Sequence, residues 1–191
     1  MYLCVYGASS QKIDRTYIEA GEKLGEIIAG HGHGLVFGAG ATGMMGAAAR
    51  GVHRIGGEII GIVPDFFNVD GELYEQCTEL LKPSTMRARK QLLEERSDGF
   101  IITPGGIGTF DEFFEILTLK QLGRHQKPIV IYNINDYYDE MLEMLQSSMD
   151  GEFVRRDCEK LYYVTSDPLE TVEYMENYVF DGAGVMMFKD I

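Results

Sequence analysis

Short apolar runs alternate with longer amphipathic segments along the whole chain. Five of the runs are rich in β-branched and aromatic residues and are bounded by glycine or proline, a pattern that predicts buried strands. These predicted strands cover residues 2–7, 34–38, 58–63, 99–104 and 128–133. Two shorter runs, at 78–82 and 161–165, are weaker strand candidates.

Between the strands, apolar residues recur at the spacing of amphipathic helices. The predicted helices cover residues 14–30, 43–56, 84–97, 109–122, 136–149 and 167–178. Alternation of strand and helix predicts βαβ units, and therefore a parallel sheet with helices on both faces. We expect residues 1–191 to form a single doubly wound, Rossmann-like α/β domain, with about the last 12 residues as a tail. In such folds ligands bind at the carboxyl ends of the strands, where the strand order reverses.

The 191-residue chain is strongly acidic, with 30 Asp and Glu against 17 Lys and Arg and a formal net charge of −13. Such a surface repels nucleic-acid backbones and anionic membranes, so we expect neither as a partner. An anionic ligand would require a local cationic pocket that works against the field of the whole protein.

The three cysteines, Cys4, Cys77 and Cys158, lie far apart and form no C-x-x-C pair. This pattern predicts a reduced, cytoplasmic protein without structural disulfides or a zinc site. The first residues lack the features of a signal peptide, and no apolar run approaches the roughly 18 residues of a membrane span. His31 and His33 stand two residues apart without further ligands, so we expect no metal there.

A first glycine loop, Gly38 to Gly46, follows the second predicted strand, and its glycines Gly38, Gly40 and Gly43 match G-x-G-x-x-G. This spacing is typical of dinucleotide-binding proteins, but it also serves tight strand-to-helix packing. An NAD enzyme should carry an acid at the end of the next strand, where Asp65 is separated from the strand by Pro64. We therefore do not favour NAD.

A second glycine loop follows the strand at 99–104, with glycines at Gly105, Gly106 and Gly108 and with Thr109 opening the next predicted helix. Backbone N–H groups at a helix start, together with the Thr109 hydroxyl, can cradle a single phosphate. No P-loop lysine follows, so a triphosphate is not expected. The loop therefore indicates a site for a single phosphate in what we expect to be a nucleotide-binding domain.

Glu112 has two interpretations. Thr109-x-x-Glu112 matches the capping box, in which the Glu side chain bonds back to the helix start, and the spacing by itself favours that role. A carboxylate held ionised by the helix dipole could instead stabilise developing positive charge during a reaction. The two roles are compatible.

The helix predicted at 84–97 carries Arg87, Arg89 and Lys90 in its first turns and Glu94 near its end. The helix dipole favours the opposite order, so this arrangement requires compensation. One compensation is an i,i+4 pair between Lys90 and Glu94, on a solvated face. The other is an anion held at the helix start, and the spacing leaves both open.

These motifs together resemble the LONELY GUY family of cytokinin-activating phosphoribohydrolases, also labelled lysine decarboxylase-like. The family pattern P-G-G-x-G-T-x-x-E matches residues 104–112, and M-x-x-R-K matches Met86, Arg89 and Lys90. The resemblance implies a Rossmann-like homodimer without cofactor or metal. It also implies hydrolysis of the N-glycosidic bond of purine nucleoside 5′-monophosphates, either AMP or cytokinin riboside monophosphates, to free base and ribose 5-phosphate.

The resemblance also implies roles for particular residues. Arg89 and Glu112 would form the catalytic pair, and Lys90 and Thr118 would line the same pocket. The 5′-phosphate would be surrounded by Gly105, Gly106, Ile107, Gly108 and Thr109. Further candidates for substrate contacts are Met86, Asp111, Gly40, Gly43 and Glu72.

The sequence departs from the family pattern at three positions, where Ala39 replaces a glycine, Asp111 a glutamate and Arg87 a histidine. Residues 65–82, which should help to shape the base pocket, match no motif, so the choice between AMP and prenylated substrates stays open. Two rival functions also stay open. They are an NAD(P)-dependent oxidoreductase using Gly38–Gly43 and a non-catalytic nucleotide carrier or sensor.

Overall fold

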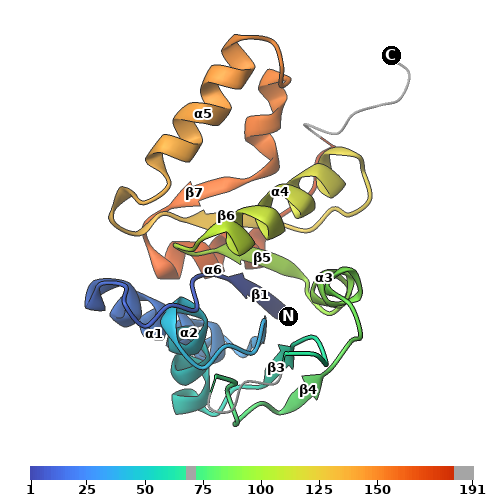
Figure 1. The fold of residues 1–191 in the computed structure, drawn as a ribbon. Helices are drawn as coiled ribbons and strands as arrows, with labels where there is room; N and C mark the ends of the chain where they lie inside the picture. Colours follow the sequence, from blue (N-terminus) through green and yellow to red (C-terminus); the bar gives the residue numbers. More distant parts are fainter. Residues whose placement is uncertain (68–71, 183–191) are drawn as a thin grey trace.

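A single sheet runs through the computed structural model, which describes residues 1–67 and 72–182 (Figure 1). Its seven strands are all parallel and lie in the order β4-β3-β2-β1-β5-β6-β7. The strands are β1 Tyr2–Tyr6, β2 Gly34–Phe37, β3 Ile59–Ile62, β4 Glu79–Leu81, β5 Gly99–Ile102, β6 Ile129–Tyr132 and β7 Tyr163–Thr165. Every predicted strand is confirmed, including the two weaker candidates.

An α-helix follows β1, β2, β4, β5, β6 and β7, as the alternating pattern predicts. The α-helices are α1 Arg15–Gly30, α2 Gly43–Ile55, α3 Met86–Glu95, α4 Ile107–Gln121, α5 Asp139–Asp150 and α6 Pro168–Asn177. Two short 3₁₀ helices, η1 Ile134–Asp136 and η2 Arg156–Leu161, flank α5 and were not expected from the sequence. The predicted C-terminal tail falls largely on residues 183–191, outside the described part of the chain.

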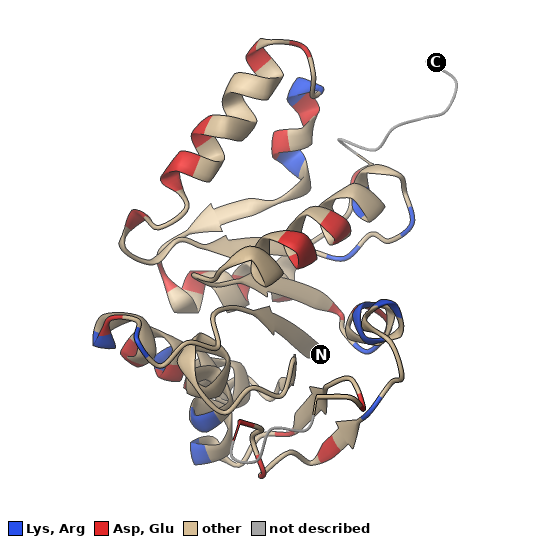
Figure 2. Ribbon diagram, in the orientation of Figure 1, with Lys and Arg blue, Asp and Glu red and all other residues tan. Residues whose placement is uncertain are grey.

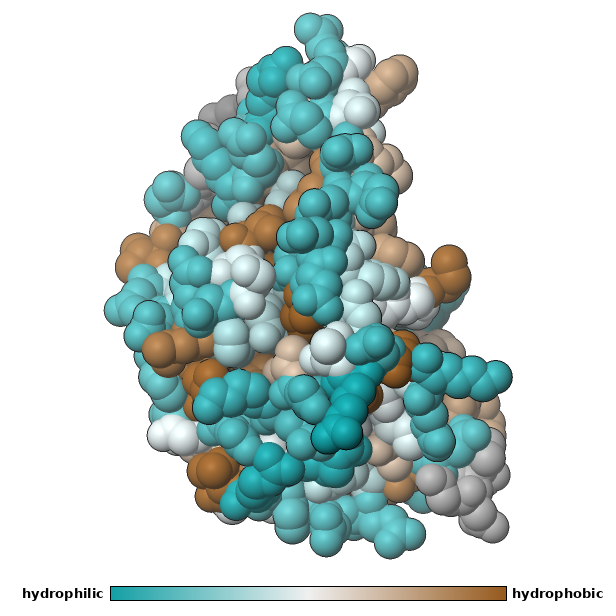
Figure 3. Space-filling model, turned by 90° about the vertical axis from the view of Figure 1, so that its left-hand side faces the viewer, coloured by the Kyte–Doolittle hydropathy of each residue, from teal (hydrophilic) through white to brown (hydrophobic). Residues whose placement is uncertain are grey.

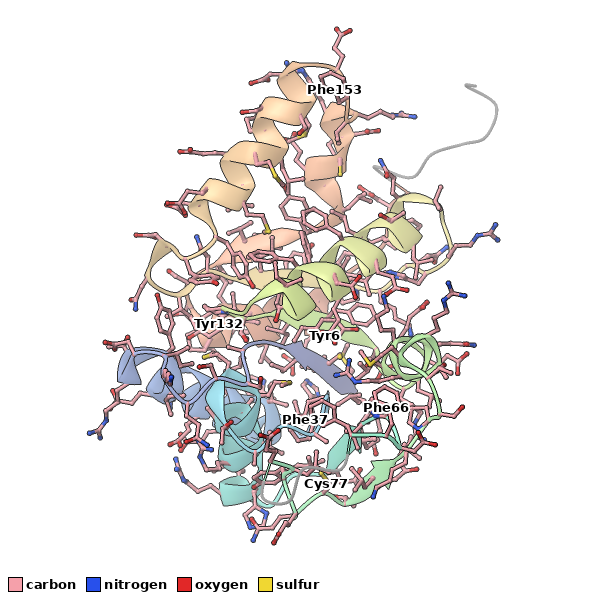
Figure 4. All side chains as sticks on the ribbon, viewed as in Figure 1. Tyr6, Phe37, Phe66, Cys77, Tyr132 and Phe153 are labelled. Atoms are coloured by element: carbon pink, nitrogen blue, oxygen red, sulfur yellow. The ribbon has the colours of Figure 1, made fainter. Side chains whose placement is uncertain are left out.

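The helices cover both faces of the sheet. Side chains of α1, α2 and α6 pack against one face with Phe37 and Tyr132, whereas those of α3, α4 and α5 pack against the other with Tyr6 (Figure 4). Successive strand residues point to opposite faces, so strands buried on both sides read as continuous apolar runs. The doubly wound fold class is therefore confirmed.

The order of the strands reverses next to β1. From β1 the chain moves through β2 and β3 to β4 on one side, and it then returns to β5 on the other side. The connections that leave β1 and β5 therefore diverge at their carboxyl ends, which opens a crevice at this point of the sheet.

On the face drawn in Figure 3, apolar side chains lie in separate spots among hydrophilic ones. Phe66 and Phe153 are among the large apolar side chains that are exposed (Figure 4). Within residues 1–67 and 72–182, no helix combines the length and apolarity that crossing a membrane requires.

Helices α1 and α2 approach each other closely because glycines lie at their contact. A Cβ atom added at Gly25 of α1 would lie 2.1 Å from the Ala48 carbonyl oxygen, and one at Gly51 of α2 would lie 2.1 Å from the Glu22 carbonyl oxygen. No side chain fits at such distances, so the two backbones must separate if either glycine is replaced. Helix α2 begins at Gly43, within the first glycine loop, so this contact also positions that loop.

We predict that Gly25→Ala lowers the free energy of unfolding by about 1–3 kcal/mol, because the added methyl group forces the helices apart. Gly30→Ala is the matched control in the same helix, since a Cβ there meets nothing within 4 Å. The free energy of unfolding of Gly30→Ala should rise by up to about 1 kcal/mol, because alanine has the higher helix propensity. Urea unfolding of the two variants measures the difference, and equal stabilities would contradict the packing argument.

Candidate active site

A cavity of about 700 Å³ opens where the strand order reverses. Five segments line it: the β1–α1 loop (7–12), the β2–α2 loop with the first turn of α2 (38–45), the chain after β3, the start of α3 and the start of α4. Its volume lies in the range of small-molecule sites, which is roughly 300–1,000 Å³. The predicted position of the ligand site at the carboxyl ends of the strands therefore coincides with a real cavity.

Arg89 and Glu112 form an ion pair in the cavity wall. Arg89 Nη1 donates to Glu112 Oε1 at 2.8 Å, and Arg89 Nε donates to the Ile62 carbonyl oxygen at 3.2 Å. Each side chain is only 11% exposed. The guanidinium is thus fixed by both β3 and α4, and a carboxylate faces the cavity beside it.

Gly38 makes room for this guanidinium. A Cβ atom at Gly38 would lie 2.3 Å from Arg89 Nη2, so any side chain there would displace the arginine. Position 43 requires glycine for a different reason. The φ of Gly43 is +63°, and a Cβ atom there would lie 2.3 Å from the Ala8 carbonyl oxygen. The first glycine loop therefore places Arg89 and packs against the β1–α1 loop.

Burial raises the pKa of Glu112 above the ordinary 4.5, and the charge and hydrogen bond of Arg89 oppose that rise. Desolvation penalises the ionised carboxylate, and the adjacent cation favours it. Burial therefore outweighs Arg89, and the pKa of Glu112 stays raised even with the arginine beside it.

The predicted capping box is wrong. Helix α4 begins at Ile107 with Gly106 as its N-cap, and the Gly106 carbonyl oxygen accepts the Phe110 N–H at 3.0 Å. Thr109 therefore lies inside the first turn and cannot cap it. The side chain of Glu112 pairs with Arg89 instead of returning to the helix start.

Lys90 faces away from the cavity. Its ammonium lies 3.0 Å from Asp111 Oδ2 and 2.6 Å from Glu115 Oε2, both on α4. The ribbon of Figure 2 shows basic positions of α3 in blue and acidic positions of α4 in red. The compensation for the basic start of α3 is therefore divided: Arg89 enters the cavity, and Lys90 pairs with α4 rather than with Glu94.

The structure brings eight of the sequence-predicted site residues into the cavity wall, and it leaves six outside. Those in the wall are Arg89, Glu112, Met86, Gly40, Glu72, Gly106, Gly108 and Thr109. Those that do not line it are Lys90, Gly105, Ile107, Asp111, Thr118 and Gly43. Ile107 is 83% exposed and Thr118 is also exposed, whereas Gly105 packs against Thr109, where a Cβ would lie 2.1 Å from Oγ1.

Sequence reasoning missed other residues of the wall. They include Gln11, Lys12, Met45, Val63, Phe67 and Leu73. The signal that could have indicated the first two is their position, because they lie in the loop after β1, at the edge of the sheet where ligands bind in such folds. The others lie in or beside loops whose path is not encoded in a local pattern, and residues 68–71 lie outside the described part of the chain.

His31 and His33 share one partner that the sequence does not reveal. Their ring nitrogens lie 3.1 Å and 2.9 Å from Glu176 Oε1, which joins the end of α1 to α6. Among the described residues, no group of three or more His, Cys, Asp or Glu is arranged to hold a metal ion. The cluster therefore acts as a polar contact between elements.

The sequence matches the family described as "Possible lysine decarboxylase" over residues 45–175. Among relatives, cytokinin riboside 5′-monophosphate phosphoribohydrolase LOG2 of Arabidopsis thaliana is 32% identical over 177 residues, covering 93% of this chain and 83% of its own. The enzyme LOG of Oryza sativa subsp. japonica is also 32% identical over 177 residues, covering 93% of this chain and 73% of its own.

Solved structures with the same fold include TM1055, with a TM-score of 0.70, 21% identity and coverage of 93% of this chain and 99% of that one. The Moco carrier protein of Chlamydomonas reinhardtii has a TM-score of 0.68 and 20% identity, with 92% and 94% of the two chains covered. These two likenesses show the fold alone. The family match and the relatives together establish that the chain belongs to the LONELY GUY family of phosphoribohydrolases.

Proposed function

We propose that this protein hydrolyses the N-glycosidic bond of purine nucleoside 5′-monophosphates to free base and ribose 5-phosphate. The relatives are named for this type of reaction on cytokinin riboside 5′-monophosphates. The observation that carries the proposal is the Arg89–Glu112 pair, which places a desolvated carboxylate in a cavity large enough for a mononucleotide.

The reaction passes through a ribosyl cation of oxocarbenium character, as in glycoside hydrolysis. Glu112, as a carboxylate in a water-poor wall, stabilises that positive charge and orients the attacking water. A fixed charge in such surroundings is more effective than one in bulk water, because it needs no reorganisation when the bond breaks. Glu112 is the catalytic carboxylate in this proposal.

Arg89 has donors left for the substrate. Nη1 and Nε are bonded to Glu112 and Ile62, while Nη2, next to Gly38, makes no hydrogen bond with the described residues. The planar guanidinium can therefore hold Glu112 with one edge and a ribose hydroxyl or phosphate oxygen with another. This division of donors explains why a single arginine serves both as a partner and as a ligand.

The start of α4 forms the proposed phosphate side of the cavity. Gly106, Gly108 and Thr109 line it, and the N–H groups of a first helical turn have no acceptors within the helix. These groups and the positive end of the helix dipole favour a phosphate. Binding energy from the phosphate would then position the glycosidic bond against Glu112.

The NAD(P) alternative is weaker because Asp65, the acid it requires, is exposed and does not line the cavity. The carrier alternative has a structural neighbour in the Moco carrier protein, but that likeness is one of fold. A carrier also has no need of a buried carboxylate with a raised pKa. We further propose a cytoplasmic homodimer as the working form.

We predict that purified protein releases free base from AMP or from isopentenyladenosine monophosphate. Glu112→Gln and Arg89→Ala should each lower kcat by about 10²–10⁴-fold, because each removes charge from the reacting centre. Chromatography of the products measures the release. Glu26→Gln is the control, since it makes the same change at a glutamate of α1 that pairs with Arg54. If the wild-type protein leaves the nucleotide intact, the proposal is contradicted and a carrier or sensor is favoured.

We also predict that kcat/KM falls on acidification with a midpoint above pH 4.5. The pKa of Glu112 is raised in the folded protein, so protonation, which removes the useful charge, occurs at higher pH than in an exposed Glu. In Arg89→Met the pKa of Glu112 should rise further, as followed by ¹³C NMR of the carboxyl carbon. Lys90→Met should raise it less, because Lys90 acts on Glu112 by charge alone. A lowered pKa in Arg89→Met would contradict the assigned cause.

A further inference from the structure

The cavity holds few cations for a ligand that carries a dianionic phosphate. Among the lining residues that the structure describes, Arg89 and Lys12 have a positive side chain, while Glu72 and Glu112 contribute negative charge. The whole chain has a net charge of −13, so the long-range field also opposes an anion. A phosphate in this cavity therefore requires a cation that is not already neutralised.

Two basic residues near the cavity are already engaged. Arg89 pairs with Glu112, so much of its charge is balanced within the wall. Lys90 is held between Asp111 and Glu115 and does not line the cavity. Neither provides an unbalanced positive charge for the substrate.

Lys12 differs from both. Its ammonium makes no hydrogen bond or ion pair with any residue in the described part of the chain, and the side chain is exposed at the cavity. Its backbone N–H donates to Ser10 Oγ at 3.2 Å, which shapes the turn that carries it. The Lys12 ammonium, carried on the β1–α1 loop, is therefore available to pair with an anionic ligand.

The loop that carries Lys12 is fastened next to the second glycine loop. The Ala8 N–H donates to the Pro104 carbonyl oxygen at 3.0 Å, directly before Gly105. On its other side, the Thr42 hydroxyl donates to the Ser9 carbonyl oxygen. The base of the loop is thus fixed to both glycine loops, and its end, with Lys12, lines the same cavity as the start of α4.

We propose that Lys12 binds the 5′-phosphate of the substrate and makes the site selective for nucleotides over nucleosides. This inference rests on the proposed function, which supplies the phosphate. A compact ammonium with three donors on a four-carbon chain can reach a phosphate oxygen from a loop without a fixed approach geometry. Lys12 is a specificity-determining residue here and has no part in the bond cleavage.

The test is to measure binding by calorimetry in a Glu112→Gln background, where AMP stays intact. Adding Lys12→Met should weaken AMP binding on the order of 10- to 100-fold, as expected when a charge-assisted contact is lost. Binding of adenosine, which lacks the phosphate, should not change. Lys23→Met is the matched control, because Lys23 is an α1 lysine outside the cavity that lies 3.9 Å from Glu26.

In the active protein, Lys12→Met should raise KM for AMP by a similar factor with little change in kcat, and Lys12→Arg should recover part of the loss. The inference is overturned if AMP binds equally well with and without Lys12, if AMP and adenosine weaken together, or if AMP does not bind. Weakened binding of AMP alone, in a protein that never releases base, would keep Lys12 as a phosphate ligand and overturn the proposed hydrolysis.

Discussion

The pairing of Arg89 with Glu112 is the constraint on which the rest of the site depends. It joins α3 to α4, and its second hydrogen bond, to the Ile62 carbonyl oxygen, fastens it to the end of β3. Both side chains are nearly buried, and removing one partner of such a pair costs about 3–5 kcal/mol, because the other charge is left uncompensated. A buried pair gives little net stability compared with apolar packing. Its value here lies in holding a carboxylate in a fixed place.

Other features follow from the space and charge that this pair requires. Gly38 has no side chain where the Arg89 guanidinium lies. The first glycine loop, whose spacing matches a dinucleotide-binding motif, therefore provides space for an arginine. The same spacing of glycines can thus have two physical uses. In one, the backbone approaches a pyrophosphate, and in the other it approaches a side chain from a different helix. The residues that pack against the glycines show which of the two uses applies.

The basic residues near the cavity differ in how they are paired. Lys90 neutralises acids on α4 outside the cavity. The wall keeps Arg89, which is balanced by Glu112, and Lys12, whose ammonium has no partner among residues 1–67 and 72–182. Each of the three acids on α4 thus has a basic partner: Arg89 pairs with Glu112, and Lys90 pairs with Asp111 and Glu115. An anionic substrate then meets the N-terminal turn of α4 and Lys12 rather than the field of the whole molecule.

The sequence by itself determined the order and type of the elements, because apolar periodicity and glycine or proline boundaries are local signals, and it placed the site at the carboxyl ends of the strands. It also indicated Arg89, Glu112 and the second glycine loop. It could not determine where α4 begins, since Gly106 and Thr109 are both acceptable caps in isolation. Only the tertiary structure decided that Glu112 meets an arginine 23 residues away, that Lys90 turns outward and that Lys12 lines the cavity. Those outcomes depend on how α3, α4 and the β1–α1 loop pack together, and no local pattern encodes such distances.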